Sequence, residues 1–129
     1  ELGIFRAQGA NPSESVSYLT YADTSDNIIY QEEVFSYTEE DSVDFSQDYH
    51  VYTLEWTNDC VQYSVDGIEV SAPITRSSFL PASWVFDREM YLVLDFAVGG
   101  SGNGGIPSGV ISPFPPFKEF IIDYVKVYQ

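Results

Sequence analysis

Short alternating segments separated by turn residues constrain the fold of this chain more than any other feature. The clearest pair is formed by residues 61–65 and 68–70, which flank the dipeptide Asp66-Gly67. Both residues of an Asp-Gly pair adopt positive φ readily, so this stretch predicts a tight β-hairpin. Residues 15–21, 28–37 and 50–56 are further β-prone segments, and no stretch shows sustained helical periodicity. The pattern therefore favours an all-β fold of antiparallel strands, either a sandwich or a jelly roll.

Length and composition predict one packed domain spanning residues 1–129. Of these 129 residues, 44% are hydrophobic and 16% are aromatic. Such a composition supplies a hydrophobic core and is far from that of a disordered chain.

The charge distribution narrows the class of partner. The formal net charge is −15, and no Lys or Arg occurs between Arg6 and Arg76. An acidic surface repels phosphate groups, so nucleic acid and anionic membranes are poor partners. The acidic surface is compatible with a neutral polysaccharide or with a cation such as calcium as partner. The alternative is a solvated acidic face that only maintains solubility.

Two absences limit the chemistry further. Cys60 is the single cysteine, which excludes an internal disulfide and, without a CxxC motif, argues against structural zinc. No apolar run approaches the length of a membrane span, so we expect no membrane insertion. His50 is the single histidine, and at the start of a strand we interpret it as a hydrogen-bonded structural residue.

Five blocks in the chain carry a resemblance to a known family. They are residues 44–57 (DFSQDYHVYTLEWT), 63–67 (YSVDG), 84–87 (WVFD), 91–100 (YLVLDFAVGG) and 122–129 (IDYVKVYQ). In this order they resemble glycoside hydrolase family 16, the laminarinase-like β-glucanases and their β-1,3-glucan-binding relatives. The resemblance implies a concanavalin-like β-jelly-roll sandwich and a secreted or extracellular protein. The family's sandwich is larger than this chain, so we expect its N-terminal portion to be absent here and to come from a preceding segment or a partner chain.

The hexapeptide from Glu1 to Arg6 decides how the resemblance bears on activity. The family carries Glu-x-Asp-x-x-Glu at about this place, which implies that Glu1 matches the nucleophile, Gly3 replaces the assisting Asp and Arg6 replaces the general acid/base. In a regular strand the first and sixth residues face opposite sides, so such a motif needs a β-bulge. Arginine does not give up its proton at working pH, so Arg6 cannot act as the acid/base. If Arg6 reaches Glu1, we expect a charge-assisted pair, and the alternative is a frayed chain start with no site.

Two residues are candidates for sugar binding. Trp84 offers an aromatic ring on which a pyranose can stack, and a place in the core is the alternative. Residues 90–98 predict a strand with a wholly apolar face and put Asp95 on the opposite face. The resemblance implies that this strand lines the cleft, where Asp95 would accept sugar hydroxyls; an exposed strand aspartate is the alternative.

The resemblance also implies a structural calcium ion, held in part by an aspartate of the final strand. Here that residue is Asp123, which precedes the run from Tyr124 to Tyr128. Calcium takes six to eight oxygen ligands, so Asp123 would supply one of several.

Three functions are compatible with these observations. The first is binding of a β-1,3-glucan by a hydrolase-like sandwich that has lost its acid/base carboxylate. The second is an active endo-β-glucanase whose second carboxylate comes from Asp95 or from elsewhere. The third is a structural subunit of an extracellular assembly.

Overall fold

The computed structural model describes residues 1–9, 11–23, 29–38, 44–79, 83–96 and 119–128. The chain divides into two units, Glu1–Met90 and Tyr91–Gln129, and each is described by itself. The prediction that residues 1–129 form one domain therefore stays a prediction.

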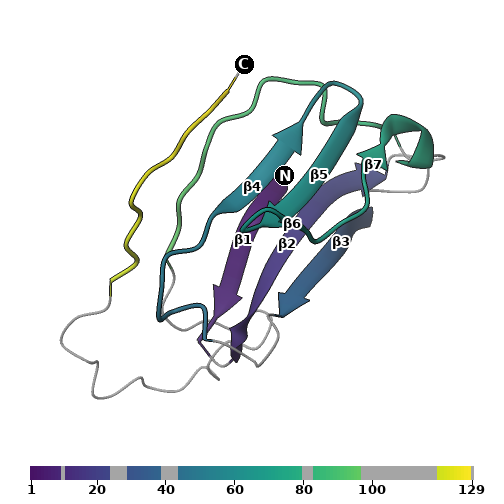
Figure 1. The fold of residues 1–129 in the computed structure, drawn as a ribbon. Helices are drawn as coiled ribbons and strands as arrows, with labels where there is room; N and C mark the ends of the chain where they lie inside the picture. The colour runs from purple at the N-terminus through teal and green to yellow at the C-terminus, as the bar shows by residue number, and fades with distance from the viewer. Residues whose placement is uncertain (10, 24–28, 39–43, 80–82, 97–118, 129) are drawn as a thin grey trace. The chain divides into compact units, whose positions relative to one another are not determined.

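The first unit consists of two antiparallel sheets (Figure 1). One sheet has the order β1-β2-β3; in the other, β5 pairs with β4, β6 and β7. The strands are β1 (Leu2–Gln8), β2 (Asn11–Asp23), β3 (Ile29–Thr38), β4 (Tyr52–Trp56), β5 (Cys60–Val65), β6 (Ile68–Glu69) and β7 (Ile74–Thr75), followed by the 3₁₀ helix η2 (Arg76–Phe79). The all-β, antiparallel fold expected from the alternating segments is confirmed.

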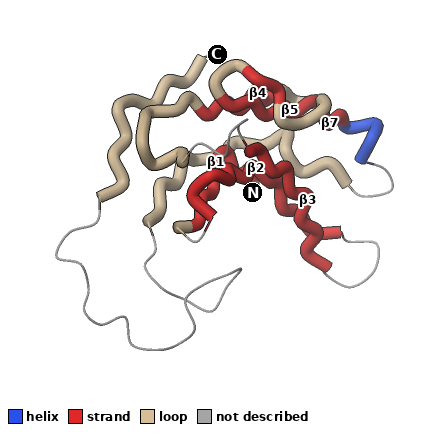
Figure 2. The backbone as a smooth tube through the Cα atoms, turned by 60° about the horizontal axis from the view of Figure 1, so that its bottom comes forward, coloured by secondary structure: helices blue, strands red, loops and turns tan. Residues whose placement is uncertain are grey.

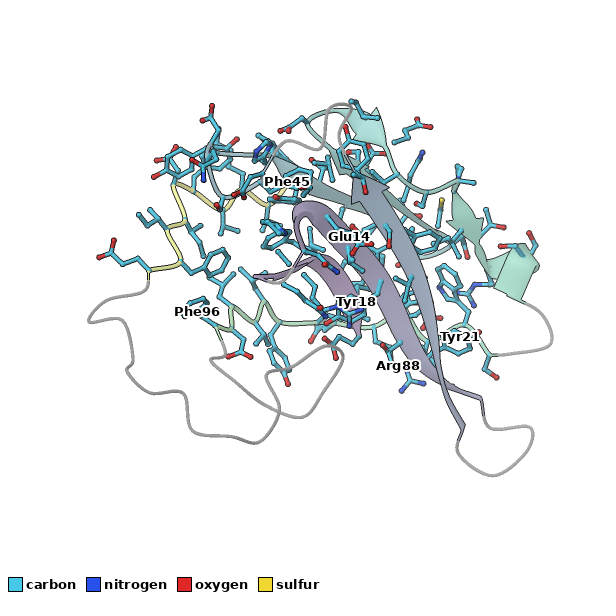
Figure 3. All side chains as sticks on the ribbon, turned by 90° about the horizontal axis from the view of Figure 1, so that it is seen from below. Glu14, Tyr18, Tyr21, Phe45, Arg88 and Phe96 are labelled. Atoms are coloured by element: carbon cyan, nitrogen blue, oxygen red, sulfur yellow. The ribbon has the colours of Figure 1, made fainter. Side chains whose placement is uncertain are left out.

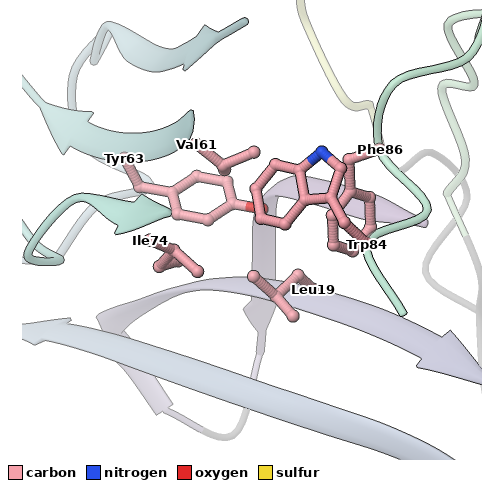
Figure 4. Close-up of a cluster of buried hydrophobic side chains, with 6 residues drawn as sticks. All are labelled: Leu19, Val61, Tyr63, Ile74, Trp84 and Phe86. Atoms are coloured by element: carbon pink, nitrogen blue, oxygen red, sulfur yellow. The ribbon is translucent and has the colours of Figure 1, made fainter. Parts of the chain in front are cut away.

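The two sheets of this unit pack face to face, as the two layers in Figure 2 show. β5 explains why, because its residues alternate between a buried and a half-buried class, with Val61, Tyr63 and Val65 buried. Leu19 of β2 meets this face from the opposite sheet. The core cluster is drawn in Figure 4 and consists of Leu19, Val61, Tyr63, Ile74, Trp84 and Phe86.

The predicted hairpin joins β5 to β6. Asp66 has φ 50° and Gly67 has φ 79°, so both turn residues adopt the left-handed conformation that the dipeptide favours. The Asp66 carboxylate also accepts the backbone N–H of Val51 at 2.7 Å, which ties the turn to the segment before β4.

The structural interpretation of His50 is confirmed. Its Nδ1 lies 2.7 Å from Oδ2 of Asp66, and its side chain is only 10% exposed. The imidazole also packs edge-on against Phe45, with ring centroids 4.8 Å apart. Within the described residues, His50 therefore joins the hairpin turn to the core instead of facing a ligand.

The second unit differs from expectation. The sequence predicts a strand over residues 90–98, yet residues 91–96 and 119–128 contain no regular strand, and residues 97 and 98 lie outside the described part. Their apolar side chains, including Leu92, Leu94 and Val125, are exposed. Alternation identifies which side chains could share a face, but a strand also needs a partner backbone, and none pairs with these residues in the part of the chain that the structure describes. Nowhere among the described residues is there a helix long and apolar enough to cross a membrane.

Candidate functional site

A β-bulge lies in β1 at the position that the hexapeptide requires. Gly3 pairs with Tyr18, whereas the next registered pair is Arg6 with Val16. Two residues of β1 thus lie opposite the single residue Ser17, whose hydroxyl donates to the carbonyl of Ile4 at 2.9 Å. A bulge is therefore present even though this stretch has no second carboxylate to give it a catalytic reason.

A packing contact of Phe5 gives a structural reason for the bulge in β1. The Phe5 ring lies 4.1 Å from the ring of Tyr52 in β4, measured between centroids. The extra residue therefore lets Phe5 join the contact between the sheets while Gly3 and Arg6 both lie on the face that carries Tyr18.

Tyr18, which is labelled in Figure 3, contacts Glu1, Gly3 and Arg6. Its hydroxyl donates to Oε1 of Glu1 at 2.6 Å. A Cβ atom at Gly3 would lie 2.2–2.4 Å from three carbons of the Tyr18 ring, so the ring rests directly on the backbone of β1. The Arg6 guanidinium carbon lies 4.7 Å from the centre of the same ring, within the range of a cation–π contact.

These contacts place Glu1, Gly3 and Arg6 on one face of the sheet, with Tyr18 as their common neighbour. We predicted that a Glu1–Arg6 pair would form if Arg6 reached Glu1; the structure instead shows Tyr18 hydrogen-bonded to Glu1. Glu1 is also part of the ordered strand region, because its backbone N and carbonyl O both bond to Thr20. The chain start is therefore not frayed, while the presence of a site there stays a prediction.

The sequence reasoning missed Tyr18. Its alternation within residues 15–21 predicted that it would lie on a strand, but the position opposite Gly3 follows only from the register of β1 against β2. The missing side chain at Gly3 was the one local signal, because glycine in a strand often marks the close approach of another group.

Trp84 lies in the core and not on the candidate face. It is 9% exposed and meets Phe86 edge-on, with centroids 5.2 Å apart. The Arg76 guanidinium lies 6.0 Å from its ring centre. A buried indole offers no open face to a sugar ring, so this structure favours the core alternative for Trp84.

Comparison with known proteins places this fold in a family. Residues 7–87 match the family Glycosyl hydrolases family 16, which is more than half of the chain. The chain belongs to glycosyl hydrolase family 16. The match covers the blocks at residues 44–57, 63–67 and 84–87, and it begins directly after the hexapeptide, so the assignment of Glu1, Gly3 and Arg6 stays a prediction.

Individual members of family 16 resemble this chain over part of their length. Glucan endo-1,3-beta-glucosidase A1 of Niallia circulans is 34% identical over 90 residues, covering 66% of this chain and 13% of the relative. The Beta-1,3-glucan-binding protein of Penaeus monodon is 32% identical over 84 residues, covering 53% of this chain and 23% of the relative. The X-ray structure of endo-beta-1,3-glucanase from Pyrococcus furiosus matches with a TM-score of 0.54 at 24% identity, over 67% of this chain and 33% of that one, which supports the fold. The chain thus spans less than a quarter of the length of these two curated relatives.

The two remaining predicted site residues of this family 16 chain lie in the second unit. Asp95 and Asp123 are both exposed, and neither belongs to a regular strand. Among the described residues, no three His, Cys, Asp or Glu side chains gather into a group that could hold a metal ion. Calcium binding through Asp123 stays a prediction.

A hollow lies on the opposite side of the β4–β6 sheet from the core. It is lined by Thr53, Glu55, Gln62, Ser64, Gly67 and Glu69. These side chains come from the polar positions of strands whose other face is buried. The hollow contains no aromatic ring, so it lacks the stacking surface that sugar sites in proteins commonly use.

Proposed function

We propose that this protein binds a neutral β-1,3-glucan on the face of β1 and β2 that carries Tyr18, and that it does not hydrolyse it. The observation that carries the proposal is the position of Arg6. The bulge brings Arg6 to the face of Glu1, where both contact Tyr18. This shared face supports the assignment in which Arg6 replaces the second carboxylate of the motif. Retaining hydrolysis requires two carboxyl groups about 5–5.5 Å apart, one of which protonates the leaving oxygen.

The glucan as ligand is supported by the family and by charge. The relative from Penaeus monodon is named a Beta-1,3-glucan-binding protein, and the relative from Niallia circulans is named an endo-1,3-beta-glucosidase. A net charge of −15 disfavours anionic polymers but leaves a neutral glucan unaffected. An extracellular location fits a protein that binds such a polysaccharide. Within the described residues β1 and β3 are sheet edges, and we propose that strands outside residues 1–129 complete the sandwich.

An active endo-β-glucanase is the second candidate. The retained bulge and the names of several relatives favour it. It would need a second carboxylate within reach of Glu1, contributed by Asp95 or by a segment outside the described residues.

Laminarin, a soluble β-1,3-glucan, separates the two candidates. We expect the protein to bind laminarin in a calorimetric titration and to release no reducing ends from it. The acid/base normally contributes about 10²–10⁴-fold in rate, so its loss leaves at most trace turnover. Robust turnover that disappears in Glu1→Gln would show that the protein is a hydrolase, and an absence of laminarin binding would contradict both candidates.

A further inference from the structure

We propose that Tyr18 is the residue that receives the sugar in this site, an inference that rests on the proposed function. The ring lies against Gly3, between the Glu1 carboxylate and the Arg6 guanidinium. Neither the family blocks nor the predicted site residues include it.

The first step of the argument is that the ring is fixed. A Cβ at Gly3 would come within 2.4 Å of three ring carbons, far inside van der Waals contact, so the ring and any side chain at position 3 exclude each other. The hydroxyl is held at 2.6 Å by Glu1, a short hydrogen bond of the charge-assisted kind. A ring held at both its body and its hydroxyl loses little side-chain entropy when a ligand binds.

The second step concerns the backbone that supports the ring. The carbonyl oxygen of Tyr18 accepts the hydroxyl of Tyr63 at 2.8 Å, and Tyr63 is fully buried in the core. The position of Tyr18 is therefore set from the interior of the sandwich, on the side opposite to its ring.

The third step is the chemistry around the ring. Tyr18 is partly buried. The C–H face of a glucose unit can stack on the part of an aromatic ring that its neighbours leave accessible. The carboxylate of Glu1 can accept a sugar hydroxyl, and the guanidinium of Arg6 is a hydrogen-bond donor. Val34, which pairs with Tyr18 from β3, is 47% exposed and extends the apolar surface.

This arrangement also changes what Glu1 does. Its carboxylate accepts a hydrogen bond from a neighbouring phenol, and the ring fills the space of the assisting side chain at position 3. The Glu1 carboxylate is therefore positioned to accept hydrogen bonds. The site recognises a neutral sugar through one aromatic ring flanked by a carboxylate and a guanidinium.

Titration of laminarin against Tyr18 variants tests the inference. Tyr18→Ala removes the ring and is expected to weaken the Kd about tenfold, which corresponds to about 1.4 kcal/mol. Tyr18→Phe keeps the ring and loses only the hydroxyl, so a loss of about threefold is expected. The matched control is Tyr49→Ala, since Tyr49 is 65% exposed and makes no part of this face; its Kd should equal that of the wild type.

Ligand protection gives a second measurement that does not depend on a variant folding. Bound laminarin should protect Tyr18 from nitration by tetranitromethane, read by peptide mass spectrometry, and should leave Tyr49 unprotected. An unchanged or tighter Kd in folded Tyr18→Ala, or equal nitration of Tyr18 with and without laminarin, would overturn the inference while glucan binding stands. Failure of the wild type to bind laminarin would instead overturn the proposed function and this inference with it.

Discussion

At the scale of single residues, the candidate site is defined by one close approach. Gly3 has no side chain, and the Tyr18 ring occupies the space that one would fill. The glycine is needed there for space, since its backbone has no unusual conformation. A substitution that looks like a simple loss of a catalytic aspartate is therefore coupled to the identity of residue 18.

Gly3→Ala is expected to destabilise the protein by about 1–3 kcal/mol, because the added methyl group overlaps the Tyr18 ring and forces it to move. Urea denaturation of the variant measures the change. Gly9→Ala is the matched control: a Cβ there meets nothing within 4 Å, so its stability should change by less than about 0.5 kcal/mol.

The same overlap predicts a non-additive pair. In a Tyr18→Ser background the ring is gone, so Gly3→Ala should cost much less than it does alone. A double-mutant cycle measures this coupling. Equal costs in both backgrounds would mean that the ring is not what excludes a side chain at position 3.

At the scale of elements, the β5–β6 hairpin is held at its turn by Asp66. One oxygen of its carboxylate accepts the Val51 N–H, and the other oxygen lies 2.7 Å from Nδ1 of His50. The backbone N–H of Asp66 donates to the Val51 carbonyl at 2.9 Å. One turn residue thus fixes the hairpin to the segment that enters β4.

Three substitutions separate the roles of Asp66. Asp66→Ala loses both side-chain contacts and is disfavoured at φ 50°, so we expect a loss of about 2–3 kcal/mol in the free energy of unfolding. Asp66→Gly keeps the conformation and loses only the contacts, and Asp66→Asn keeps the conformation and can still accept from Val51. The expected order of stability, measured by chemical denaturation, is Asn above Gly above Ala. Equal stability of the Gly and Ala variants would show that backbone conformation contributes nothing.

At the scale of the first unit, the Tyr63 hydroxyl connects the two sheets. It reaches from β5 across the core to the Tyr18 carbonyl in β2 (Figure 4 shows its place in the core). Burial, with a smaller contribution from Tyr18, raises the pKa of Tyr63 above its ordinary value. The folded protein therefore keeps this hydroxyl protonated at a pH where the unfolded chain releases the proton.

The sign of the resulting pH dependence follows from linkage. A raised pKa in the folded state gives stability that is present below the ordinary value of 10.0 and is lost as the pH rises above it. Tyr63→Phe removes this titration and the hydrogen bond, so at pH 7 it should be less stable than the wild type by about 1 kcal/mol. Denaturation curves from pH 8 to 11 should show this difference shrinking. Parallel curves would contradict the prediction, and Tyr49→Phe serves as the control for an exposed tyrosine.

The sequence predicted the local features of this protein well. The Asp66-Gly67 hairpin and the alternation of β5 depend on neighbours close in the chain or on a period of two, so the residues themselves specify them. The structural role of His50 was also predicted, although its partner Asp66 lies 16 residues away. The bulge in β1 was not predicted for this chain: the spacing showed only that a motif of this kind needs one to bring its ends onto one face, and the missing carboxylate removed the catalytic reason for it.

Only the tertiary structure decided the rest. The sequence alone left Trp84 between the core and the surface, because an amphipathic ring is compatible with both, and packing against Phe86 placed it inside. The alternation of residues 90–96 predicted an apolar face, but alternation does not supply a second strand to pair with. These residues form no regular strand. Tyr18 became part of the site through its register opposite Gly3, a relation between two strands that neither strand carries in its own sequence.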